Sequence, residues 1–183
     1  MRPVDIQSGL RIVIENLEKI GIDYMIVGSV AGTLYGEPRL TNDMDILLAL
    51  IPHTARSFLS GFDPLEFHLP PENILAHEAT RGGQTNLIHH ASGVKIDIMF
   101  RKSNPHGIAE FERRGRIEIL KGLHAWIAAP EDVIIGKLRF YREGQSSKHL
   151  TDIRGILANT PVDQSYLDHW ITDLDLETYW KRL

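Results

Sequence analysis

The residues that decide the fold are 26–48, IVGSVAGTLYGEPRLTNDMDILL. An apolar run ends at Gly28-Ser29, small residues follow, and Asp43 and Asp45 open a second apolar run. Apolar runs broken by glycine and proline are typical of strands joined through turns and short helices. The pattern predicts a strand, a short helix and a second strand, at residues 23–27, 29–35 and 43–50.

Gly28 and Ser29 lie where the first predicted strand turns into the helix. The first N–H groups of a helix have no partner within it, so at this turn they would face outward and cradle a phosphate. A tight turn with a helix cap is the alternative interpretation of these two residues. Their meaning therefore depends on what lies beside them.

Asp43 and Asp45 are two positions apart in the second predicted strand, so their carboxylates share one face of it. Two like charges at this distance repel and raise the pKa of one another. A divalent cation relieves the repulsion, and Mg²⁺ prefers carboxylate oxygen together with substrate phosphate. A phosphate cradle next to such a pair is typical of phosphoryl or nucleotidyl transfer, whereas the acids alone could be a solvated strand edge.

A third acid occurs in residues 94–100, VKIDIMF, where apolar residues alternate and Lys95 and Asp97 share the opposite face. With residues 85–90 this segment predicts a hairpin whose turn is at 91–93. Asp97 is thus an acid on a strand otherwise suited to burial. On this pattern alone it could lie on the exposed face of a half-buried hairpin.

Two tripeptides, VGS at 27–29 and DMD at 43–45, are separated by thirteen residues. Together they resemble the signature of the DNA polymerase beta-like nucleotidyltransferase superfamily, in which a third carboxylate arrives on a neighbouring strand. The resemblance implies an α+β fold with a mixed central sheet flanked by helices. It also implies an NTP substrate and Mg²⁺ or Mn²⁺ held by Asp43, Asp45 and Asp97.

Residues 130–157, PEDVIIGKLRFYREGQSSKHLTDIRGIL, carry a second resemblance. They are similar to the C-terminal motif of AbiEii-type nucleotidyltransferases, the toxins of type IV toxin/antitoxin pairs. The motif lysine matches Lys137, the motif aspartate matches Asp152, and Lys148 stands in the basic position ahead of it. The same group shares the pattern Arg39-x-Thr41-x-Asp43.

The resemblance gives these residues roles beside the three acids. It places Gly28, Ser29, Arg39, Thr41 and Lys137 in nucleotide binding. Lys137 would stabilise the triphosphate charge, and Asp152 would orient that lysine or bind the nucleotide. Structural alternatives stay open, since Lys137 and Asp152 could form a salt bridge between helices and Arg39 could pair with Glu37 or Asp43.

The remaining sequence predicts mainly helices, at residues 3–20, 52–59, 70–80, 106–114, 129–142, 146–158, 162–170 and 174–181. Residues 117–127 predict one or two strands with a turn at Lys121-Gly122. Strand and helix alternate only up to about residue 130. We therefore expect a nucleotidyltransferase core at residues 1–128 and a C-terminal helical subdomain at 129–183, which could pack as one domain.

Composition excludes several classes of protein. The chain has no cysteine, a net charge of −4, and no apolar run that approaches a membrane span. The first residues contain no signal-peptide apolar region, so we expect a cytoplasmic protein without a membrane partner. The run Arg113-Arg114-Gly115-Arg116 with Lys121 is usually a solvated face, but it is the best candidate for contact with RNA.

These observations together predict a metal-dependent nucleotidyltransferase that moves NMP from an NTP to a hydroxyl on RNA, tRNA or protein. The second resemblance adds a toxin role with a cognate antitoxin as partner. The first alternative is a non-catalytic nucleotide- or partner-binding regulatory module on the same fold. Another is adenylylation of a small molecule, which would need a closed acceptor pocket rather than an open basic groove.

Overall fold

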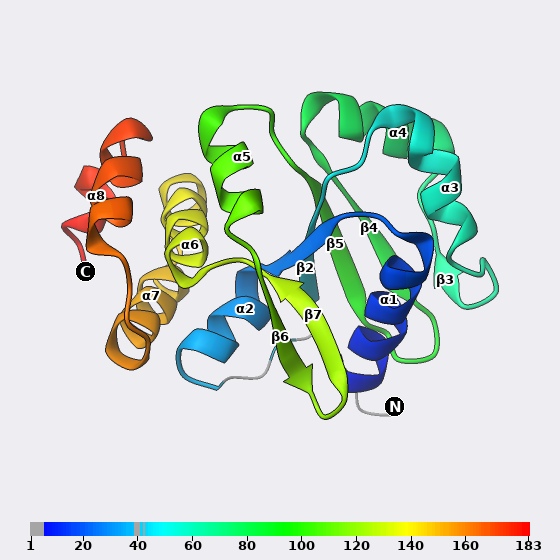
Figure 1. The fold of residues 1–183 in the computed structure, drawn as a ribbon, viewed down its shortest axis with the longest axis horizontal. Coiled ribbons are helices and arrows are strands. Elements are labelled where there is room, and N and C mark those ends of the chain that lie inside the picture. The colour runs from blue at the N-terminus through cyan, green and yellow to red at the C-terminus, as the bar shows by residue number, and fades with distance from the viewer. Residues whose placement is uncertain (1–5, 39–40, 42) are drawn as a thin grey trace.

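The computed structural model describes residues 6–38, 41 and 43–183, with no side chain described at residue 6. Within them, seven strands form one sheet in the order β3-β4-β5-β2-β1-β7-β6 (Figure 1). The strands are β1 (Tyr24–Val27), β2 (Asp43–Leu48), β3 (Phe67–His68), β4 (Gln84–His89), β5 (Lys95–Phe100), β6 (Gly115–Leu120) and β7 (Leu123–Ile127).

The helices cover both faces and one end of the sheet (Figure 1). They are α1 (Ile6–Ile20), α2 (Gly28–Tyr35), η1 (Pro52–Thr54), α3 (Ala55–Ser60), α4 (Glu72–Arg81), α5 (Pro105–Glu112), α6 (Pro130–Gly144), α7 (Lys148–Asn159), α8 (Gln164–Asp173) and α9 (Glu177–Trp180). The sheet is mixed, because β2 pairs with β5 and β1 with β7 in parallel while its other pairings are antiparallel. The predicted α+β fold with a mixed, helix-flanked sheet is confirmed.

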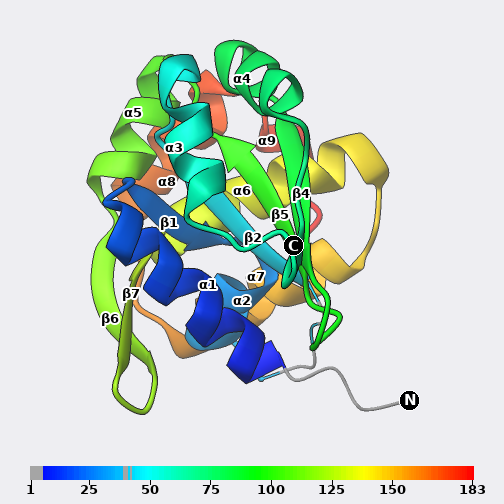
Figure 2. The same cartoon turned by 90° about the vertical axis from the view of Figure 1, so that its right-hand side faces the viewer.

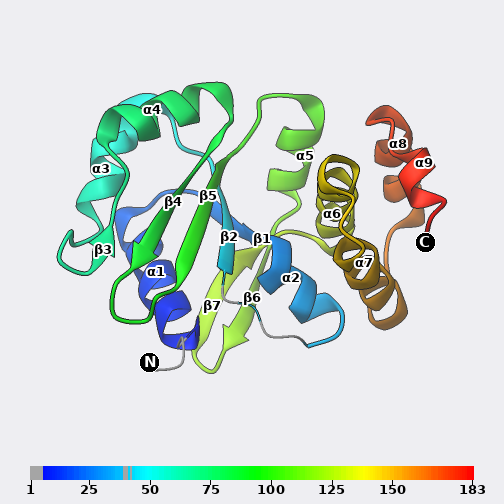
Figure 3. The ribbon, with the colours of Figure 1, turned by 180° about the vertical axis from the view of Figure 1, so that it is seen from behind.

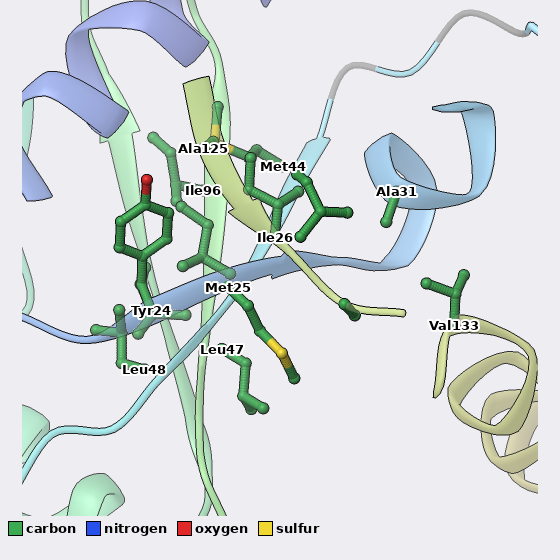
Figure 4. Close-up of a cluster of buried hydrophobic side chains, with 14 of the residues drawn as sticks. Tyr24, Met25, Ile26, Ala31, Met44, Leu47, Leu48, Ile96, Ala125 and Val133 are labelled. Carbon is green, nitrogen blue, oxygen red and sulfur yellow. The ribbon is translucent and has the colours of Figure 1, made fainter. Parts of the chain in front are cut away.

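One face of the sheet is apolar and packs against α1, which lies in front of it beside α3 in Figure 2. Met44 and Ile46 of β2 and Ile96 and Ile98 of β5 are completely buried on this face. The strand alternation expected for residues 94–100 is therefore present, with its apolar side turned inward. In Figure 4, Met25 and Leu47 point to the other side of the sheet.

On that other side α2 contacts β1, β2 and α6 (Figure 3). We call this side the polar face, because Asp43, Asp45 and Asp97 project from it beside the apolar Leu47 and Met99. The Tyr35 hydroxyl at the end of α2 donates to the Ala128 carbonyl at 2.9 Å, and the Thr160 hydroxyl donates to the Tyr35 carbonyl at 2.6 Å. These contacts tie α2 to the helices that follow β7. Only helices occur after Ile127 in the described chain, as the sequence predicts, whereas a division at residue 128 stays a prediction.

The structure corrects several predicted elements. The two-residue strand β3 was not predicted, because a pairing this short leaves no alternating pattern. The helix predicted at 52–59 begins as a 3₁₀ turn, and the last predicted helix shrinks to α9. Helix α6 runs to Gly144, two residues beyond its predicted end, and the residue that caps it in the left-handed conformation, at φ 50°, is Gln145. Across the described residues, no helix is long and apolar enough to cross a membrane.

The central strand gives a direct test of the packing. Ile46 is fully buried between Ile26 and Ile98, which pair with it in register. Replacing Ile46 with Ala should lower the free energy of unfolding by about 2–5 kcal/mol in urea denaturation, because a cavity remains. The same substitution at Ile51, which is 53% exposed, is the control and should cost less than about 1 kcal/mol. Equal losses at both positions would contradict this packing.

Candidate active site

The site begins with the register of β2 against β5. The two strands run in parallel with Asp45 opposite Asp97 and Asp43 opposite Lys95. Residues directly opposite on neighbouring strands project to the same side of a sheet, so Asp45 and Asp97 meet on the polar face. Burial, together with Asp97 and Asp43, raises the pKa of the Asp45 carboxyl, although the Ser29 N–H and Lys137 oppose this shift.

The turn before α2 closes over Asp45. Gly28 has φ 61°, and a Cβ atom there would collide with the Asp45 carboxylate, so glycine is required on both counts. The backbone N–H of Ser29 donates to Oδ2 of Asp45 at 3.1 Å. This differs from the expectation that the N–H groups of the turn face outward, because the amide of Ser29 already stabilises a buried carboxylate.

Lys95 neutralises the second acid. Its Nζ lies 2.7 Å from Oδ1 and 2.9 Å from Oδ2 of Asp97, with 43% of the lysine and 30% of the aspartate side chain exposed. The hydrogen bond to Asp97 raises the pKa of Lys95. Lys95 was not predicted as a site residue, although its place two positions before Asp97 puts both side chains on one face.

Lys137 and Asp152 form a buried ion pair between α6 and α7. The Nζ–Oδ2 distance is 2.7 Å, and the side chains are only 4% and 12% exposed. The aliphatic end of Lys137 packs on α2, since a Cβ at Gly32 would lie 2.8 Å from its Cε. Lys137 thus lies between α2 and α7. The salt bridge that was predicted as the structural alternative is therefore present, and its lysine also faces the site.

Two further predicted residues precede β2. The Thr41 hydroxyl donates to the carbonyl of Asp43 at 3.0 Å, which fixes the start of the strand. Arg39 lies outside the described residues.

The donor set suits a hard divalent cation, because it consists of carboxylate oxygens. In residues 6–38, 41 and 43–183, however, no three His, Cys, Asp or Glu side chains are arranged as a ready metal site. The ammonium group of Lys95 provides the positive charge beside Asp97 instead. Asp43, Asp45 and Asp97 could hold such an ion once the Asp97 carboxylate exchanges this lysine for it.

The basic run at residues 113–116 is not a free cationic surface. Arg113 lies 2.7 Å from Glu131 and 3.3 Å from Asp132, and its guanidinium stacks on Tyr166 at 3.8 Å. Arg114 and Arg116 form ion pairs with Asp23 and Glu18. The arginines that made this run a candidate for RNA contact are thus paired within the protein.

A cavity of about 350 Å³ opens beside the carboxylates, between the polar face of the sheet and α6. Leu47 and Met99 form its floor, two positions along their strands from Asp45 and Asp97. Gly28 and Lys137 also line it, together with charged groups from α4, α5 and α6. Gly28 and Lys137 therefore belong both to the surroundings of the carboxylate pair and to the lining of this partly open cavity.

Comparison with known proteins defines the class of fold. No family model and no curated protein matches the sequence. Among solved structures, an antigenic nucleotidyltransferase-like protein from Paracoccidioides brasiliensis matches with TM-score 0.57 and 20% identity, over 96% of this chain and 91% of its own.

Two antibiotic-modifying proteins match as well. The lincosamide adenylyltransferase LnuA, solved with lincomycin, matches at TM-score 0.54 and 14% identity, over 87% of this chain and 100% of its own. ANT(2")-Ia, solved with adenylyl-2"-tobramycin, matches at TM-score 0.61 and 11% identity, over 94% of this chain and 97% of its own. The chain therefore has the nucleotidyltransferase fold, and at these identities the similarity extends to the fold alone.

Glu110, an acid that lines the cavity, makes the stability of the protein depend on pH. Burial, with Asp132 nearby, raises the pKa of Glu110 from 4.5 to about 7. The folded state therefore favours the protonated acid, and stability falls as the pH rises through this window. Glu110→Gln should raise the free energy of unfolding by about 1–3 kcal/mol near pH 8 and leave it unchanged near pH 4.

Urea denaturation across this pH range measures the effect. Glu112→Gln, at an exposed position on the same helix, is the matched control and should follow the wild-type curve. If the free energy of unfolding changed with pH in the same way for Glu110→Gln and the wild type, the assignment of a raised pKa to Glu110 would be contradicted.

Proposed function

We propose that this protein is a metal-dependent nucleotidyltransferase that moves NMP from an NTP to a hydroxyl acceptor. The observation that carries the proposal is the in-register pairing of Asp45 with Asp97, directly beside the Gly28-Ser29 turn. Two carboxylates side by side in a partly buried site are costly for a purely structural purpose. A binding module without turnover, which is the alternative, would have no use for such an acid cluster.

In this proposal Asp43, Asp45 and Asp97 hold Mg²⁺ or Mn²⁺. The cluster fits the cation because it consists of carboxylates, and because the pKa of Asp45 is raised partly by its acidic neighbours. When bound, the ion supplies charge neutralisation for the triphosphate and for the attacking and leaving oxygens.

The triphosphate would lie between the N-terminus of α2 and Lys137. The positive end of the α2 dipole and the lysine ammonium both favour negative charge there. Asp152 holds the ammonium at 2.7 Å and thereby orients it toward the site. Gly28 lets the phosphate approach the backbone closely. Thr41 lies just before β2 at the same end, and both Thr41 and Arg39 are proposed to contact the nucleotide.

The chemical step needs few protein groups. The acceptor oxygen forms a bond to the α-phosphorus, and the bond from this phosphorus to the bridging oxygen of the leaving group breaks, which releases pyrophosphate. Asp97 orients the acceptor hydroxyl and takes its proton. Burial and the ion pair with Asp152 keep the Lys137 ammonium fixed, where it stabilises charge that develops on the phosphates.

Two classes of acceptor remain candidates. The AbiEii-type resemblance at residues 130–157 supports RNA, tRNA or protein, with a toxin role and a cognate antitoxin. A small hydroxylated molecule is supported by the cavity beside the site and by the pairing of Arg113, Arg114 and Arg116 with acids. The structures solved with lincomycin and with adenylyl-2"-tobramycin are those of small-molecule modifiers. Incubation with labelled NTP and either acceptor pool distinguishes the two.

Removal of the acids tests the metal assignment. The triple variant Asp43→Asn, Asp45→Asn and Asp97→Asn should lose the Mg²⁺-dependent part of NTP binding in calorimetry, because it has no carboxylate left to hold the ion. Asp175→Asn is the control, since it removes a charge at an exposed position with φ 55°, which asparagine tolerates. Unchanged metal-dependent binding by the folded triple variant would refute the assignment.

Lys95 provides an independent test that does not need NTP. Lys95→Met removes the ammonium that competes for Asp97, so the affinity for Mn²⁺ alone should rise about two- to fivefold, as expected for a partly exposed ion pair. The concentration of free Mn²⁺, followed by electron paramagnetic resonance, measures this affinity. Lys121→Met removes an exposed charge elsewhere and should have little effect. An unchanged or weaker affinity in Lys95→Met would argue against competition at Asp97.

A further inference from the structure

An exposed aromatic ring lies on the wall of the cavity. Phe140 of α6 lines it and is 42% exposed, although large apolar side chains are normally buried. The ring stacks on His149 of α7, with ring centroids 5.9 Å apart and an interplanar angle of 19°. A ring that is supported on one side and borders a cavity is suited to stack against another flat group.

The position of Phe140 on α6 links it to the proposed triphosphate site. Val133, Gly136, Lys137, Phe140 and Glu143 all line the cavity, at the spacing that places residues on one helix face. Phe140 follows Lys137 by three residues, which corresponds to about 4.5 Å along the helix axis. A ligand whose phosphates reach Lys137 therefore extends along α6 toward Phe140.

Gly136 leaves room for such a ligand. Glycine is the least favourable residue after proline inside a helix, so its presence in the middle of α6 needs a reason. No packing contact supplies one, because a Cβ at Gly136 would meet no described atom within 4 Å beyond its own helix backbone and chain neighbours. The missing side chain enlarges the cavity beside Lys137, one helical turn before Phe140.

We propose that this wall of α6 binds the nucleoside half of the NTP, with the base stacked on Phe140 and the sugar over Gly136. The inference rests on the proposed function and adds a subsite to it. Lys102 and Arg139 also line the cavity and add positive charge for an anionic ligand. Stacking accepts every base, since each has a flat π face, so Phe140 contributes affinity without choosing among the four NTPs.

The experiment compares two probes with Mg²⁺ present: the NTP that binds most tightly among ATP, GTP, CTP and UTP, and inorganic tripolyphosphate. Phe140→Leu should weaken NTP binding in calorimetry at least about fivefold, because base stacking is lost. Binding of tripolyphosphate should stay within about twofold of wild type, because the probe has no base. Phe140→Tyr keeps the ring and should bind the NTP like wild type.

Gly136→Ala should change stability and NTP binding in opposite directions. The methyl group favours the helix, so the midpoint of thermal unfolding should rise, while it fills the proposed sugar site and weakens NTP but not tripolyphosphate binding. Wild-type NTP affinity in both Phe140→Leu and Gly136→Ala would overturn the inference. So would an equal loss for both probes, or wild-type protein that binds tripolyphosphate as tightly as any NTP. If wild-type protein bound neither probe, the proposed function itself would fail.

Discussion

The parallel, in-register pairing of β2 with β5 is the constraint on which the rest of the site depends. It places Asp45 opposite Asp97, and a slip by one residue would turn every side chain of β5 to the other face. The apolar face prevents this slip, because Ile46 and Ile98 pair there with no exposure to solvent. The same burial that stabilises the sheet therefore fixes two like charges beside each other.

The position of α6 depends on a second set of charges. Arg113 binds Glu131 and Asp132 at the start of α6, and the Tyr166 hydroxyl donates to Asp132 at 2.7 Å. These buried bonds join α6 to the residue after α5 and to α8. Because they fix the first turn of α6, they also fix Lys137 two turns later against α2. The acids at this helix start thus do more than complement its dipole.

Much of the fold could be predicted because its signals are local. Alternation in residues 94–100, the glycine after the first strand and the proline at the start of α6 each specify an element by short-range chemistry. The strand β3 could not be predicted, because the strand that pairs with it, β4, is distant in sequence. The left-handed Gln145 could not be predicted either, because glycine is the usual residue in this conformation at a helix end. The acids of the candidate site follow from strand periodicity, which places Asp97 on the polar face.

The sequence did not determine which charged side chains pair with each other, because long-range packing decides these ion pairs. From the sequence, Lys137 and Asp152 could form either a structural salt bridge or part of a site, and the structure shows that the bridge forms and that its lysine lines the cavity. The arginines of residues 113–116 form a charged run in one dimension, but the fold pairs each of them with an acid from another segment. Because Asp45, Asp97 and Lys137 come from separate stretches joined by a non-local ladder, a nascent chain cannot assemble the candidate site until α6 has emerged from the ribosome.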